Sequence, residues 1–219
     1  MQQILVYGDS LSWGIIPGTR QRHPFPVRWP GRLEIALRAA GHEVRLIEDC
    51  LNGRRTVWDD PFKAGRKGID GLAQRIEVNS PLDLVILMLG NNDFQSMHPL
   101  KAWHAAQGVA ALVETIRQAP IEPGMPVPPI LIVAPPPIGI PAGTMAEKFR
   151  DGDVKCTGLA QALAQVARDT GCAFFDAGHV IHSSATDGVH LDAHAHEQLG
   201  DALVAPVLAA LSAGDAAAP

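Results

Sequence analysis

The sequence lacks the features that mark membrane proteins, nucleic-acid-binding proteins and secreted proteins. No uninterrupted apolar run approaches the roughly 18 residues of a membrane span. Lys and Arg number 18 against 23 Asp and Glu, and no basic stripe with interleaved aromatic residues occurs, so we do not expect nucleic-acid binding. The chain enters an apolar run almost at once, with no basic stretch before a leader-like segment, so we expect no secretory signal.

Cysteine is also scarce. Cys50, Cys156 and Cys172 are an odd number at no metal-like spacing, and we interpret them as small core residues of a reduced, cytoplasmic protein. No internal repeat or linker interrupts the 219 residues, of which 47% are hydrophobic, enough for a substantial core. We therefore expect a single domain over residues 1–211, followed by a flexible tail over residues 212–219.

Strand-like and helical patterns alternate along the chain. Apolar runs predict strands at residues 3–7, 43–47, 82–89, 129–133 and 173–175. Between them, apolar residues at i, i+3, i+4 and i+7 predict helices; the last should begin after Asp192, a good N-cap, and break or kink at Pro206. The alternation predicts a flavodoxin-like α/β fold, with a five-stranded parallel sheet of order 2-1-3-4-5 and helices on both faces.

The most informative stretch is Gly-Asp-Ser-Leu-Ser-Trp-Gly at residues 8–14, directly after the first predicted strand. Glycine at both ends lets the backbone turn tightly and approach a ligand closely. Because α/β sheets bind ligands at the carboxyl ends of their strands, Ser10 is a candidate nucleophile. Gly-Asp-Ser is also common in turns and helix caps, so this stretch alone does not decide the function.

Two further polar segments should meet Ser10 at the same sheet edge. In the order 2-1-3, the second and third strands flank the first. Asn-Gly-Arg-Arg-Thr at residues 52–56 follows the second strand, and Gly-Asn-Asn-Asp at residues 90–93 follows the third. Acyl transfer needs hydrogen-bond donors where the tetrahedral oxyanion forms, and backbone N–H groups with an Asn amide can supply them.

A serine nucleophile needs a base, and His190 is the best candidate. Asp187 precedes it by three residues, so one turn can place the carboxylate against one imidazole nitrogen and leave the other for Ser10. The 177–190 segment is long enough to cross the roughly 14 Å between the fifth and first strands. A surface turn before a helix would give the same spacing.

These four segments together resemble the motif blocks of the SGNH hydrolases, also called GDSL esterases. They are Gly-Asp-Ser-Leu at 8–11, the Gly53 turn, Gly-Asn-Asn-Asp at 90–93 and Asp-Gly-Val-His at 187–190, in the family's order and over nearly the whole chain. The strings at 10–14, 27–29 and 52–61 look like the bacterial arylesterase and acyltransferase branch. The Gly-x-Ser-x-Gly elbow of α/β-hydrolases is absent, because Ser12 stands at its second glycine.

The resemblance implies a role for each site residue. Ser10 is the nucleophile, His190 the general base and acid, and Asp187 the acid that orients it. The backbone N–H groups of Ser10 and Gly53 and the amide of Asn92 form the oxyanion hole. No cofactor is implied, and the protein is expected to act on a small-molecule ester and to assemble as a homo-oligomer.

The predicted activity is that of a serine esterase acting on short-chain, acetyl-like esters, including aryl esters, with acyl transfer to alcohols or peroxide as a further capacity. Carbohydrate O-acetyl esterase, lysophospholipase and thioesterase activities remain alternatives. Leu11, Trp13 and Trp58 are candidate walls of a small apolar pocket, although core packing explains such residues equally well.

Two other kinds of site remain open. His190, His194 and His196 lie close enough in sequence to share a metal, but no known zinc motif accompanies them. A turn after the first strand could instead hold a phosphate at a helix N-terminus, which would need no His190.

The remaining polar residues of these segments have structural interpretations. We interpret Arg28, Arg54 and Arg55 as surface ion pairs rather than substrate contacts, and Asp93 as a brace for its loop. The proline-rich stretch at 135–141 should form a stiff loop with apolar surface, as an oligomer contact requires.

Overall fold

The computed structural model describes residues 1–217, and the side chains of residues 1–213. It contains a parallel five-stranded sheet of order β2-β1-β3-β4-β5, which is the predicted order. The strands are β1 (Gln2–Gly8), β2 (Val44–Cys50), β3 (Leu84–Met88), β4 (Ile130–Ala134) and β5 (Ala173–Asp176). Each overlaps the run predicted for it.

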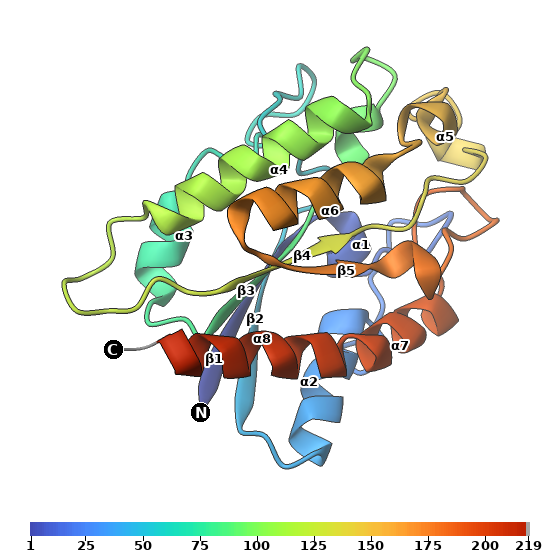
Figure 1. Ribbon diagram of the computed structural model, residues 1–219. Coiled ribbons are helices and arrows are strands. Elements are labelled where there is room, and N and C mark those ends of the chain that lie inside the picture. The colour runs from blue at the N-terminus through green and yellow to red at the C-terminus, as the bar shows by residue number, and fades with distance from the viewer. Residues whose placement is uncertain (218–219) are drawn as a thin grey trace.

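Helices cover both faces of this sheet (Figure 1). The α-helices are α1 (Ser10–Trp13), α2 (Trp29–Ala39), α3 (Leu72–Asn79), α4 (Ala102–Arg117), α5 (Gly152–Lys155), α6 (Leu159–Thr170), α7 (Ala193–Ala202) and α8 (Val204–Ala217). Short 3-10 helices are η1 (Asn91–Phe94), η2 (Gly143–Met145) and η3 (Ala177–His179). Helices α3, α4 and α6 pack on one face, and α2, α7 and α8 on the other. In the described part of the chain, every helix is too short or too polar to cross a membrane.

The core has two halves, one on each face of the sheet. Along β1, Leu5 and Tyr7 belong to the cluster under α3, α4 and α6, whereas Ile4 and Val6 belong to the cluster under α2, α7 and α8. All four are 0–2% exposed. Because both faces of the strand are buried, its sequence is a continuous apolar run rather than an alternating one.

The carboxyl-terminal helices refine the predicted boundaries. Asp192 caps α7, and its side chain accepts the backbone N–H of Ala195 at 3.0 Å. The predicted break falls between α7 and α8, and Pro206 lies in the first turn of α8, where its missing N–H is tolerated. Helix α8 continues to Ala217, so the chain stays helical beyond the predicted domain boundary at residue 211. Residues 218–219 of the predicted tail lie outside the described residues.

Candidate active site

The candidate nucleophile stands at the first turn after β1. Asp9 caps α1, and its side chain accepts the backbone N–H of Leu11 at 2.9 Å. Ser10 is the first residue of this helix and is 6% exposed. A Cβ on Gly8 would lie 2.5 Å from Oγ of Ser12, so only glycine fits where the strand turns into the helix. This tight turn fixes Ser10 at the carboxyl edge of the sheet.

Asp187 and His190 form the pair that the spacing predicts. Nδ1 of His190 lies 2.7 Å from Oδ2 of Asp187, and Oδ1 of Asp187 accepts the backbone N–H groups of Val189 and His190. Burial acts to raise the pKa of Asp187, but these hydrogen bonds outweigh it and hold that pKa below its ordinary value. Asp187 therefore stays ionised and holds the imidazole with Nε2 available to a second partner.

The proline-rich loop supports this turn from outside. The backbone N–H of Gly139 donates to the carbonyl of Gly188 at 2.8 Å, and that of Ala142 donates to the carbonyl of Asp187 at 3.0 Å. Gly188 has φ +76°, and a Cβ there would lie 2.2 Å from the carbonyl oxygen of Ile140. The stiff loop therefore packs directly on the turn that carries Asp187 and His190.

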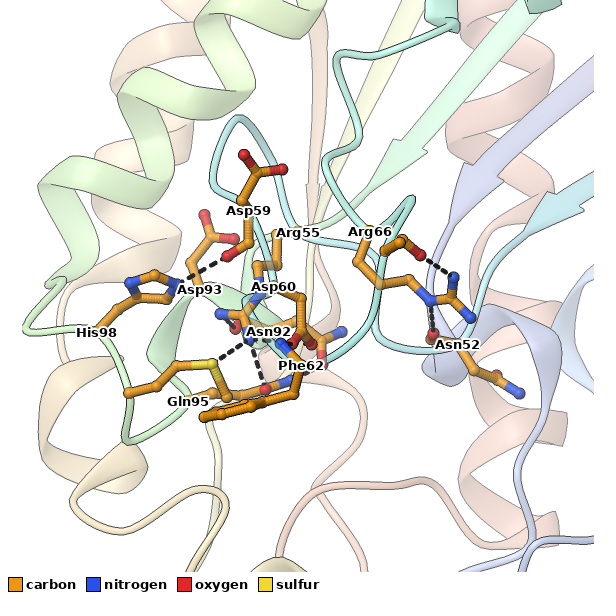
Figure 2. A network of polar contacts seen from close by, with 12 residues as sticks. Asn52, Arg55, Asp59, Asp60, Phe62, Arg66, Asn92, Asp93, Gln95 and His98 are labelled. Carbon is orange, nitrogen blue, oxygen red and sulfur yellow. Dashed lines mark hydrogen bonds and ion pairs between the residues drawn. The ribbon is translucent and has the colours of Figure 1, made fainter.

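Asn92 is held from both ends of its amide. Its Nδ2 donates to Oδ2 of Asp9 at 2.8 Å, and its Oδ1 accepts from Nε2 of Gln95 at 2.7 Å. Arg55 completes this arrangement, since it donates to Oε1 of Gln95 at 2.6 Å and to the carbonyl oxygen of Asn92 at 2.9 Å. Figure 2 shows Arg55, Asn92 and Gln95 gathered in this way. We call Asp9, Arg55, Asn92 and Gln95 the buried network.

Arg28, Arg54 and Arg55 form ion pairs, but the prediction that these lie at the surface is wrong. Arg55 is 0% exposed and Arg54 5% exposed, because each neutralises buried oxygens. Arg54 donates to the carbonyl of Gly8 and to Asp49. The side chain of Arg28 is 11% exposed and pairs with Glu48 through two hydrogen bonds. Sequence reasoning missed the role of Arg55 because its partners lie far away in the chain.

Asp93 braces its loop, as predicted. Its carboxylate accepts the backbone N–H and the hydroxyl of Thr56, which ties the segment after β2 to the segment after β3. Burial raises the pKa of Asp93 to about 7, against the hydrogen bonds from Thr56. Burial likewise raises the pKa of Asp9 to about 6.

One cavity of about 420 Å³, including space at its open mouth, brings most of the predicted site residues together. Ser10, Gly53, Asn92 and His190 all line it, and Asp187 lies behind His190. Its other lining residues are Ile15, Arg20, Asn52, Asp60, Lys63, Met145, Lys148 and Phe149. Its enclosed space is only about 40 Å³, so the cavity is small.

The predicted pocket residues lie elsewhere. Leu11 is 2% exposed and packs in the core cluster under α2, α7 and α8. The ring of Trp13 lies under the Arg22 guanidinium at 4.8 Å, and neither Trp13 nor Trp58 is among the residues that line the cavity. The apolar walls come instead from Ile15 and from residues 145 and 149, which the sequence pattern did not single out because they follow the long loop after β4.

His196, one of the three histidines considered for a metal site, makes a structural hydrogen bond instead. Nδ1 of His196 accepts the backbone N–H of Trp29 at 3.2 Å, and burial lowers the pKa of His196 to about 3. Among the residues that the structure describes, no group of three or more His, Cys, Asp or Glu side chains is placed to hold a metal ion.

Known proteins resemble this chain in sequence and fold over most of its length. The sequence model of the GDSL-like lipase/acylhydrolase family matches residues 6–198. No curated protein matches the chain. The native aryl esterase of M. smegmatis has 33% sequence identity and a TM-score of 0.90, over 96% of this chain and 100% of that one. A carbohydrate acetylesterase from Sinorhizobium meliloti has 33% identity and a TM-score of 0.89, over 95% and 99%.

A more distant structure shares the fold. The lipase/acylhydrolase from Enterococcus faecalis has 17% identity and a TM-score of 0.66, over 94% of this chain and 95% of that chain. The described architecture is therefore common to proteins with little sequence similarity.

Proposed function

Because the chain belongs to the GDSL-like lipase/acylhydrolase family and is thus a carboxylic ester hydrolase, we propose that it is a serine esterase acting on short-chain esters, aryl esters among them. The observation that carries the proposal is the shared cavity of Ser10, His190, Gly53 and Asn92. A nucleophile, a base and hydrogen-bond donors within one cavity are the parts that acyl transfer requires.

The first half of the reaction forms an acyl-enzyme. Oγ of Ser10 attacks the ester carbonyl carbon while Nε2 of His190 accepts the hydroxyl proton. Asp187, 2.7 Å from Nδ1, stabilises the imidazolium that results. The C–O bond to the alcohol then breaks, and His190 returns the proton to the departing oxygen.

The second half releases the acid. Water attacks the acyl carbon, His190 accepts a proton from it, and the bond to Ser10 Oγ breaks as that proton returns to the serine. An alcohol or peroxide in place of water would give acyl transfer, which we include in the proposal as a secondary activity. The products formed with and without added alcohol measure it.

Three donors are available for the oxyanion. In the described part of the chain, the backbone N–H groups of Ser10 and Gly53 donate to no other protein group. The Asn92 amide uses one of its two N–H groups on Asp9 and keeps the other. The φ of +83° at Gly53 favours glycine and turns this segment toward the cavity that it lines.

The cavity volume supports a preference for short acyl groups. A series of p-nitrophenyl esters from acetate to octanoate tests this, and we expect kcat/KM to fall as the chain lengthens. Highest turnover on octanoate would contradict it. The similarity to a carbohydrate acetylesterase favours sugar O-acetyl esters as the main alternative substrate, with lysophospholipid and thioester substrates behind it. Profiling with acetylated sugars, lysophospholipid and acyl thioesters separates these.

Exposed apolar residues favour a homo-oligomer. Ile140 on the proline-rich loop is 84% exposed, although its neighbour Ile138 is buried in the core. We therefore propose that this loop contributes to a contact between copies of the chain. Light scattering tests it, and a monomer mass would contradict it.

The central test compares wild type with Ser10→Ala on p-nitrophenyl acetate. We expect the wild type to hydrolyse the ester and the variant to lose that activity while its circular dichroism is unchanged. Equal turnover by both proteins would show that Ser10 is not the nucleophile.

A further inference from the structure

Three basic side chains reach the catalytic cavity from separate parts of the chain. Arg20 follows α1, Lys63 lies in the loop between β2 and α3, and Lys148 lies just before α5. All three line the cavity that contains Ser10 and His190. Since the whole chain has a formal net charge of -5, this gathering of positive charge is local. We call Arg20, Lys63 and Lys148 the cationic mouth.

The cationic mouth has little negative charge to balance it. Within the described part of the chain, none of its three members forms an ion pair. The acid among the lining residues is Asp60, and its carboxylate is already engaged. It accepts the backbone N–H of Phe62 at 2.9 Å and lies 3.4 Å from Nη2 of Arg55.

These charges act on one another. Burial lowers the pKa of Lys148, and although Asp60 acts to raise it, the positive charges of Lys63, Arg20 and Arg55 lower it further. Three positive charges held together with Asp60 as the acid among the lining residues repel one another, and an anion placed among them reduces that repulsion. The cavity is therefore better suited to a negatively charged ligand than to a neutral one.

On the basis of the esterase function proposed above, we propose that the cationic mouth selects esters that carry an anionic group, such as a carboxylate, on the alcohol side. Arg20 and Lys63 are exposed, whereas Ser10 is buried, so the positive charge lies outward from the reacting carbonyl. A short acyl group such as acetyl bears no further substituent, so the alcohol must carry the charge.

A matched pair of aryl acetates tests this selection. We expect kcat/KM for 4-acetoxybenzoate to exceed that for methyl 4-acetoxybenzoate by about tenfold at low salt, each normalised to its own hydroxide-catalysed rate. Added NaCl should reduce this ratio, because salt screens charges at an open cavity mouth. A ratio near one at low salt, with the neutral ester still hydrolysed, would overturn the inference and leave the esterase function intact.

Charge-removing variants locate the effect. We expect Lys148→Gln to lower the ratio at least about threefold, and the triple variant with Arg20→Gln and Lys63→Gln to bring it close to one. Arg45→Gln is the matched control, since Arg45 is exposed near the opposite end of β2 and its loss changes the net charge equally. A ratio that survives in the triple variant would overturn the assignment.

Binding to the Ser10→Ala variant keeps the two proposals separate. Calorimetry should show tighter binding of 4-acetoxybenzoate than of its methyl ester, even if the wild type hydrolysed neither ester and the esterase proposal failed. Equal affinities would contradict the cationic mouth by themselves.

Discussion

Two regions present polar groups to the same cavity but fix them in different ways. In the turn at residues 187–190, the hydrogen bonds that join Asp187 to His190 span only four consecutive residues. In the buried network, Asn92 is bonded to Asp9, 83 positions away, and to Arg55, 37 positions away. The local turn depends on a short spacing, whereas the buried network exists only once the sheet has brought three strand ends together.

The two regions also shift the pKa values of their carboxyl groups in opposite directions. Hydrogen bonds from the turn outweigh burial and hold the pKa of Asp187 below its ordinary value. In the buried network, burial dominates and raises the pKa of Asp9 to about 6. The turn therefore holds a fixed negative charge beside His190, while the buried network carries a carboxyl group that titrates close to neutral pH.

The largest effect is expected from substituting Asp187 in the turn at residues 187–190. Asp187→Asn should lower kcat by about 10⁴-fold, because the amide no longer stabilises the imidazolium or holds the productive tautomer. Steady-state hydrolysis of p-nitrophenyl acetate measures it, and Asp169→Asn, an exposed residue of α6, is the control. A loss of less than about tenfold would mean that the turn does not orient the base.

The next largest effect is expected from Asn92, the member of the buried network that lines the cavity. Asn92→Ala should lower kcat by about 10²–10³-fold with little change in KM, because the amide acts on the oxyanion and not on the ground-state ester. Asn79→Ala, at the end of α3, controls for loss of an amide. If turnover of Asn92→Ala equalled that of wild type, the proposed oxyanion role would be wrong.

A smaller effect is expected from Gln95, which donates a hydrogen bond to Asn92. Gln95→Glu keeps an acceptor for Arg55 but replaces the N–H that faces Oδ1 of Asn92 with an oxygen. We expect kcat to fall about tenfold, because the Asn92 amide is no longer oriented. In the Asn92→Ala background the same change should have no further effect, as a double-mutant cycle would reveal.

The control for this cycle is Gln107→Glu, at an exposed position of α4. Additive losses from Gln95→Glu and Asn92→Ala would show that Gln95 acts on the fold in general and not through Asn92.

The smallest expected effect is on the pH dependence of the free energy of unfolding. Asp9 and Asp93 have folded-state pKa values raised to about 6 and 7 from 3.8, so the folded protein binds more protons than the unfolded chain between about pH 4 and 7. The free energy of unfolding should therefore fall as pH rises through this interval, by about 1 kcal/mol or more. Asp187 acts oppositely, and its contribution is lost as pH falls below about 4.

Urea denaturation at pH 5 and pH 8 measures this slope. Asp93→Asn should flatten it, whereas Asp187→Asn should leave it unchanged over that range. Stability that rises from pH 5 to pH 8 in the wild type would contradict the raised pKa values of the buried carboxyl groups.

The same contrast explains what could be predicted from sequence. Strand order and the pairing of Asp187 with His190 follow from apolar runs and a three-residue spacing, which are local signals. Ser10, Gly53 and Asn92 could be placed at one edge because parallel strands end there together. The fold therefore predicts which edge of the sheet carries the site, but not which residues line the cavity.

The parts that could not be predicted depend on long-range contacts. Arg55 looked like a surface residue, because nothing near it in sequence reveals that Gln95 and the Asn92 carbonyl surround it. The cavity walls at Met145 and Lys148 come from an irregular loop with no periodic pattern. Leu11, chosen for its neighbour Ser10, faces the core because adjacent residues on a helix point in different directions.

The most direct test of the account is to locate the site of covalent modification by a fluorophosphonate, a reagent that phosphonylates activated serines. We predict a single adduct in the intact-mass spectrum of the wild type, mapped to the peptide that contains Ser10, and none in Ser10→Ala. A folded wild type that remains unlabelled, or an adduct on another residue, would contradict the claim that Ser10 and His190 form a working nucleophile and base. In that case the turn after β1 would be better explained as a phosphate-binding loop.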